Sequence, residues 1–176
     1  MRIYSDNKLI NAIGFQLCWW LIALYKQEYV SIAIALIVLH FQLLKFHKTK
    51  EVIFVFFISI IGIAIDSLLL SLGVFNIENP LDLGVMIIPF WLMVLWVSFS
   101  LTLNHCLSWI FNRNLVLIFF GGAGGALSYV GAAKLGALES LLPPAQFFIT
   151  LFFVWVMVFF IAKTIRGWIF KPWEKL

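Results

Sequence analysis

Long apolar runs separated by short polar stretches divide the chain into six segments. The runs predict helices at about 9–25, 29–44, 52–73, 88–111, 115–135 and 145–165. Each run has roughly the 20 apolar residues that a ~30 Å bilayer core requires, although the second is slightly shorter. Apolar and polar residues do not alternate as they would in the strands of a membrane barrel, so helices are the expected spanning elements.

The basic residues gather in alternate loops, and this predicts the orientation. They flank the first, second, fourth and sixth runs as Arg2, Lys8, Lys45, Lys48, Lys50, Arg113, Lys163, Arg166, Lys171 and Lys175. The intervening loops hold Glu28, Glu78, Asp82 and Glu139, with Lys26 and Lys134 as their basic residues. Basic residues mark cytoplasmic loops. We therefore predict an all-α, polytopic integral membrane bundle of six transmembrane helices with both termini cytoplasmic.

The composition supports one transmembrane domain over residues 1–176. The chain is 64% hydrophobic and only 11% charged, whereas a soluble domain is about half apolar and about a quarter charged. No polar stretch is long enough to fold separately. The net charge of +4 indicates membrane anchoring, so the expected partners are membrane lipids and not nucleic acid.

We predict that the run 88–111 organises the bundle, because it combines aromatic and polar groups. It opens with Pro89 and carries Trp91 and Trp96, and it ends in polar groups that include Asn104 and His105. Asn104 and His105 are candidate catalytic residues, as acid–base or orienting groups. The alternative is a histidine hydrogen-bonded to a backbone carbonyl near the membrane interface.

Asp66 is the clearest polar group inside a predicted span. It shares a helical face with small residues, among them Ser59 and Gly62. An ionisable residue within a span is a functional candidate, and it is also able to serve as hydrogen-bonded glue between helices. Both interpretations stay open at this point.

A rise of 1.5 Å per residue separates the polar groups by depth. Asp66 falls in the outer half, whereas Asn104 and His105 fall in the cytoplasmic half, so we do not expect Asp66 and His105 to pair directly. The candidate ligand-binding residues from both halves are Gln16, Trp20, Asp66, Trp91, Trp96, Asn104, His105, Ser128 and Tyr129.

The fifth run is rich in glycine, with Gly121, Gly124 and Gly125 at helical spacing. Glycine lets helix backbones approach closely, so we expect this helix to pack in the middle of the bundle. A ligand lying against the glycine face is the functional alternative.

Motifs of known enzyme classes do not occur in the sequence. It has no HExxH, GxSxG or CxxC, and its three histidines are too few for a di-iron histidine box. We therefore expect no metal and no cofactor, and we leave open whether the chain is an enzyme.

Several short motifs together resemble one family. They are Asn11-Ala-Ile-Gly-Phe-Gln16, Gly62-Ile-Ala-Ile-Asp66, Pro89-Phe-Trp91-Leu92, Thr102-Leu-Asn104-His105 and Gly124-Gly125-Ala-Leu-Ser128-Tyr129. They are similar to those of the bacterial inner-membrane proteins in domain-of-unknown-function family 2878. The resemblance extends through the fifth run, and it departs at Ala126, where the family pattern has proline. It implies a small, multi-pass protein of the bacterial inner membrane and brings no established activity.

Three functions follow as hypotheses. The first is a protein that binds or transports a small or lipid-like ligand in a polar bundle interior. The second is an intramembrane enzyme, or an accessory subunit, in envelope lipid modification. The third is a structural assembly subunit that has a membrane protein partner.

Overall fold

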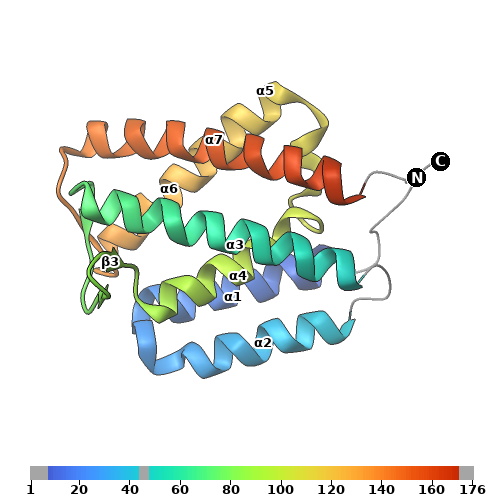
Figure 1. Ribbon diagram of the computed structural model, residues 1–176, viewed down its shortest axis with the longest axis horizontal. Coiled ribbons are helices and arrows are strands. Elements are labelled where there is room, and N and C mark those ends of the chain that lie inside the picture. The colour runs from blue at the N-terminus through green and yellow to red at the C-terminus, as the bar shows by residue number, and fades with distance from the viewer. Residues whose placement is uncertain (1–7, 44–47, 171–176) are drawn as a thin grey trace.

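The computed structural model describes residues 8–43 and 48–170, and these are mainly helical (Figure 1). The helical elements are α1 (Lys8–Tyr25), η1 (Lys26–Tyr29), α2 (Val30–Leu43), α3 (Lys48–Ser71), α4 (Phe90–Leu103), η2 (Ser108–Asn112), α5 (Asn114–Val116), η3 (Leu117–Gly122), α6 (Ala123–Lys134) and α7 (Pro144–Phe170). The prediction of an all-α fold is confirmed.

Within the described residues, four helical stretches are long and apolar enough to cross a membrane. They cover residues 8–41, 49–71, 114–134 and 144–170, and α4 is a shorter apolar helix. The first stretch turns back on itself at Lys26, which has a φ of +50°. As a result, α1 and α2 lie side by side as a hairpin (Figure 1). These helices agree with an all-α membrane bundle.

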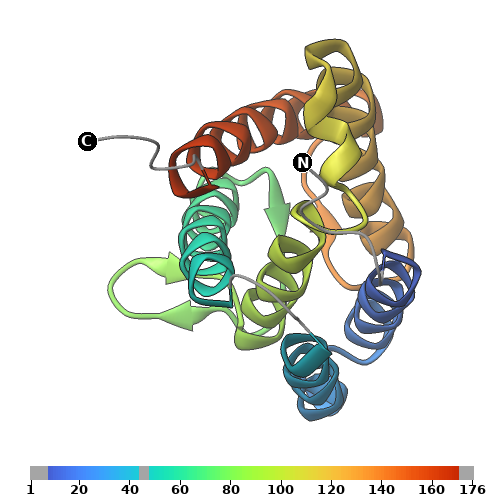
Figure 2. The same cartoon turned by 90° about the vertical axis from the view of Figure 1, so that its right-hand side faces the viewer.

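Helix α4 lies at the centre of the bundle. Viewed along the helices, α1, α2, α3, α6 and α7 surround it (Figure 2). Ten of its residues are buried, including polar Ser98, Ser100 and Thr102. A helix that is enclosed on all sides has no single apolar stripe. The buried hydroxyl groups of Ser100 and Thr102 hydrogen-bond to a neighbouring helix or to carbonyl oxygens of α4 itself.

The structure corrects the expectation of one continuous helix over residues 88–111. Helix α4 ends at Leu103, and a turn leads into the separate 3₁₀ helix η2. The amide N–H of Cys106 donates to the side-chain oxygen of Asn11 at 3.1 Å. The helix ends here because a side chain from α1 replaces the carbonyl acceptor that a continuing helix would have provided.

The end of the bundle opposite the start of α3, here called the loop end, contains four short strands. β1 (Phe75–Asn76) pairs antiparallel with β4 (Glu139–Ser140), and β2 (Leu81–Asp82) pairs antiparallel with β3 (Met86–Ile87). The β1–β4 pair joins the segment after α3 to the segment before α7. The sequence pattern did not predict these strands.

Two glycines allow the chain to turn into the β1–β4 pair. Gly73 has a φ of +69° after α3, and Gly136 has a φ of +75° after α6. At both sites the next residue donates its N–H back to the helix, from Val74 to Leu69 and from Ala137 to Ala132. This is the Schellman arrangement, in which glycine adopts the left-handed conformation at little cost.

Orientation in a membrane stays a prediction. Four of the basic residues that carry it, Arg2, Lys45, Lys171 and Lys175, lie outside the described residues.

Candidate functional site

Asp66 forms a buried cluster with Trp96 and Tyr129, here called the Asp66 cluster. Its side chain is 1% exposed, and its Oδ2 accepts hydrogen bonds from Trp96 Nε1 and Tyr129 Oη, both at 2.6 Å. The three residues come from α3, α4 and α6. The carboxylate therefore holds two aromatic side chains from separate helices in fixed positions.

Small residues on the surrounding helices make room for the aromatic rings. A Cβ added to Gly62 would overlap the ring of Trp96, and one added to Gly125 would overlap the ring of Trp155. The Trp96 and Trp155 rings are stacked, with centroids 5.3 Å apart and an interplanar angle of 12°. The Asp66 cluster thus continues into an aromatic layer that reaches α7.

A cavity of about 250 Å³ lies beside this layer. It is enclosed by α1, α4, α7 and the run from η3 to α6. Its lining residues are Phe15, Trp19, Ala23, Trp91, Leu92, Leu95, Trp96, Phe99, Leu107, Ile110, Phe120, Gly121, Gly124, Gly125, Ser128, Tyr129, Ala132, Ala137, Leu138, Trp155 and Phe159. Trp96 and Tyr129 are part of this wall, whereas the Asp66 carboxylate stands behind them.

The glycines of the glycine-rich helix have two different environments: some pack against α7, and one faces open space at the cavity. Gly121 and Gly125 receive the rings of Phe159 and Trp155 from α7. Gly124 lines the cavity, and a Cβ added there would meet nothing within 4 Å. The expected close packing is therefore present, against α7, and Gly124 leaves open space on the cavity side. The expectation that this helix lies in the middle of the bundle is wrong, because α4 occupies the centre and Phe119, Phe120 and Leu127 are exposed.

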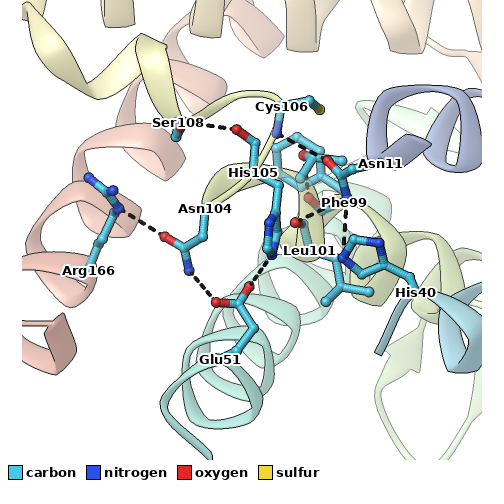
Figure 3. Close-up of polar contacts among 11 residues, drawn as sticks. Asn11, His40, Glu51, Phe99, Leu101, Asn104, His105, Cys106, Ser108 and Arg166 are labelled. Atoms are coloured by element: carbon cyan, nitrogen blue, oxygen red, sulfur yellow. Dashed lines mark hydrogen bonds and ion pairs between the residues drawn. The ribbon is translucent and has the colours of Figure 1, made fainter. Parts of the chain in front are cut away.

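A second group of polar side chains lies where α3 begins, and we call it the Glu51 cluster (Figure 3). Glu51 is fully buried, and its Oε2 accepts a hydrogen bond from Asn104 Nδ2 at 3.0 Å. Its Oε1 lies 3.4 Å from His105 Nε2. Arg166 Nε donates to Asn104 Oδ1 at 2.9 Å. The cluster joins α3, the end of α4 and α7.

Asn11 and His40 extend this cluster toward α1 and α2. The imidazole rings of His40 and His105 are 5.0 Å apart in a T-shaped arrangement. The amide nitrogen of Asn11 lies 3.5 Å from His40 Nε2 (Figure 3). Polar groups at this end of the bundle therefore connect side chains from α1, α2, α3, α7 and the turn after α4.

The structure divides the predicted site residues into three sets. Asp66, Trp91, Trp96, Ser128 and Tyr129 lie at or directly behind the cavity. Asn104 and His105 belong to the Glu51 cluster. Gln16 and Trp20 lie on the exposed side of α1, where Trp20 is 45% exposed, and they line neither the cavity nor the Glu51 cluster.

Asp66 and His105 lie in different clusters. Glu51 and Asp66 are separated by fifteen residues of α3, which corresponds to about 22 Å along the helix axis. A direct contact between the two predicted ionisable groups is therefore not made, and each has partners of its own.

Sequence reasoning missed Glu51 and Arg166, although helical spacing was a usable signal. On α3, Glu51 lies three residues before buried Phe54 and seven before buried Ile58, so it shares the buried helical face that also carries Asp66. On α7, Arg166 follows buried Ala162 by four residues. Arg166 counts in the sequence only as one of the basic residues that flank the sixth run, and Glu51 directly follows Lys48 and Lys50, so both segments look polar throughout.

Metal ligands do not gather in the described part of the chain. Residues 8–43 and 48–170 contain no group of three or more histidine, cysteine, aspartate or glutamate side chains placed to hold an ion. The expectations about metals and cofactors stay predictions.

The helices and cavity define an all-α protein with membrane-like helices and an aromatic interior cavity. A family model described as "Protein of unknown function (DUF2878)" matches residues 8–161, so the chain belongs to this family. The family resemblance in the sequence is thereby confirmed. No curated protein and no solved structure matches the chain.

Proposed function

We propose that this protein binds a small or lipid-like ligand in the aromatic cavity, as a binding or transport protein. The observation that carries the proposal is the cavity of about 250 Å³ together with the buried carboxylate that fixes two of its wall residues. Ligand sites are mostly apolar hollows with a few well-placed polar groups. A volume above the roughly 150 Å³ of an apolar cavity that admits benzene is sufficient for part of a lipid-like molecule.

In this proposal, Trp91, Trp96, Ser128 and Tyr129 contact the ligand, and Asp66 is a positioning residue. The Asp66 carboxylate accepts hydrogen bonds from Trp96 and Tyr129. These two hydrogen bonds orient both side chains before a ligand arrives. Preorganisation of this kind reduces the entropy that binding would otherwise cost.

We also propose that the bundle crosses the bacterial inner membrane six times with both termini in the cytoplasm. Four long apolar stretches support this. The first is a hairpin and counts as two crossings, so these stretches give five, and α4 would be the sixth. Helix α4 has 14 residues, or about 21 Å, which is short for a ~30 Å core unless η2 completes the crossing. The Glu51 cluster then lies toward the cytoplasm.

Filling the cavity is expected to abolish ligand binding. Ser128→Phe places a ring in the cavity, whereas Leu127→Phe places the same ring on the exposed face one residue earlier. Purified protein would be incubated with palmitic acid and measured by native mass spectrometry. From the bound fraction, we expect the dissociation constant for palmitic acid to be at least about tenfold higher for Ser128→Phe than for the wild-type protein, equivalent to about 1.4 kcal/mol of binding free energy. Leu127→Phe should match the wild-type protein.

Equal binding by the two variants would contradict the proposal, because it would place the palmitic acid outside the cavity. Failure of the wild-type protein to bind palmitic acid or any co-purified apolar molecule would contradict it as well.

The Glu51 cluster favours a second candidate function, an intramembrane enzyme or accessory subunit acting on envelope lipids. The specific observation is the 3.4 Å approach of Glu51 Oε1 to His105 Nε2. A carboxylate beside an imidazole is a common arrangement for general acid–base catalysis, and Asn104 would orient the carboxylate.

Glu51→Gln tests this second candidate, because it preserves the shape of the side chain and removes the carboxylate. If the cluster is catalytic, cells carrying the variant are expected to lose the lipid product as completely as cells lacking the gene, while the protein accumulates normally. The measurement is whole-cell lipid profiling, and Glu28→Gln at an exposed position of η1 is the control. An unchanged lipid profile in Glu51→Gln cells would exclude the enzymatic role.

A further inference from the structure

Three polar side chains in the cavity wall have partners within the protein. Trp96 Nε1 and Tyr129 Oη donate to Asp66. Ser128 Oγ donates to the carbonyl oxygen of Gly125 at 2.7 Å. The remaining lining residues are mainly aromatic and aliphatic. A polar solute would lose hydration in this cavity and gain few hydrogen bonds in return, because the lining is mainly apolar. A hydrocarbon chain has no such desolvation cost.

The cavity reaches the protein surface on one side of the run from η3 to α6. Phe120, which is 60% exposed, and Gly124, which is also exposed, both form part of its wall. Because no neighbouring atom lies within 4 Å of a Cβ built at Gly124, the wall is open at this position. We call this opening the mouth.

Helix α1 approaches α6 through Trp19, at a point about two helical turns from Gly124. The indole of Trp19 lines the cavity, and its ring lies 3.6 Å from the position of a Cβ built on Gly131 of α6. One side chain therefore spans from α1 to α6 beside the opening. A rotation of that indole would change the width of the mouth while leaving the helices in place.

The helices on both sides of the mouth expose apolar side chains. Leu17 is exposed on α1, and Phe120 is exposed on the other side. In the proposed membrane arrangement these faces contact lipid. A molecule that reaches the mouth then comes from the hydrocarbon layer and not from water.

We infer that the cavity takes the hydrocarbon chain of a membrane lipid, which enters sideways between α1 and α6 while the polar head remains outside. This inference rests on the proposed function and specifies its ligand class and route of entry. Gly124 keeps the mouth open, and Trp19 determines its width. The cavity volume of about 250 Å³ accommodates part of one chain and excludes a whole lipid.

The test uses a fatty acid that carries a diazirine near the end of its chain. The full-length protein is placed in phosphatidylcholine nanodiscs, the probe is added, and flashes of light at successive times attach it to nearby residues. Mass spectrometry then measures adducts on the α7 peptide that contains Trp155, a residue in the cavity wall. The variants are Gly124→Phe, Trp19→Ala and, as the matched control, Leu127→Phe.

We expect Gly124→Phe to slow cavity labelling about tenfold or more, Trp19→Ala to accelerate it, and Leu127→Phe to leave it unchanged. If Gly124→Phe and Trp19→Ala both label at the wild-type rate, the lateral route is wrong while ligand binding in the cavity survives. If the wild-type α7 peptide near Trp155 acquires no adduct, the proposed function itself fails. Gly124→Val provides the same comparison with a smaller side chain should Gly124→Phe not accumulate.

Discussion

Replacing Gly62 with alanine is expected to destabilise the bundle by about 3 kcal/mol, at the upper end of the usual range for overpacking. The added Cβ would overlap the indole of Trp96. That ring has no free direction in which to move, because it is hydrogen-bonded to Asp66 and stacked on Trp155. The cost exceeds the helix-propensity gain of about 1 kcal/mol from replacing glycine with alanine.

Gly14→Ala is the matched control, since an added Cβ at Gly14 meets nothing within 4 Å. The same substitution in another apolar helix should therefore be neutral or slightly stabilising. The measurement is the fraction of purified protein that remains monodisperse in detergent after heating. Equal thermal stability of the two variants would show that the Trp96 ring does not occupy the space against Gly62.

The second large effect is expected at Asp66. Asp66→Ala would leave two buried donors, Trp96 Nε1 and Tyr129 Oη, without an acceptor. An unsatisfied buried donor costs about 1–3 kcal/mol, so the loss for the pair is expected to be about 2–6 kcal/mol by the same estimate. Palmitic acid binding should fall together with stability, because both aromatic wall residues lose their fixed positions.

Asp66→Asn separates hydrogen bonding from charge. The asparagine carbonyl oxygen has two lone pairs and is able to accept both hydrogen bonds. We expect this variant to retain most of the wild-type thermal stability and palmitic acid binding. If Asp66→Asn were as unstable as Asp66→Ala, the negative charge itself, and not the acceptor for the two aromatic groups, would be the important property of this site.

The all-α fold class could be predicted from the sequence, because each helix of such a bundle corresponds to a long apolar run. The sequence was insufficient for the end of α4. The residue that ends that helix is Asn11, whose side chain accepts the N–H of Cys106 from 95 positions away along the chain. No local pattern indicates such a contact. The β1–β4 pair escaped prediction for a similar reason, since its two strands are far apart in sequence.

In contrast, some of the polar site residues could be recognised from the local sequence alone. An aspartate within a long apolar run stands out whatever its partners are, and Asp66 was found in this way. Its partners were not predicted as a set, because the contact of Trp96 and Tyr129 with one carboxylate depends on how three helices pack. Glu51 was hidden by the lysines around it, although its spacing from Phe54 and Ile58 placed it on the buried face.

The most direct measurement is an experimental structure of the protein in lipid with a fatty acid that carries bromine at the end of its chain. Bromine scatters anomalously, so its position is found independently of the protein. We predict a bromine peak inside the cavity, among Trp96, Gly124 and Trp155. A well-ordered protein with bromine peaks only on the outer, lipid-facing surface would contradict binding in the cavity.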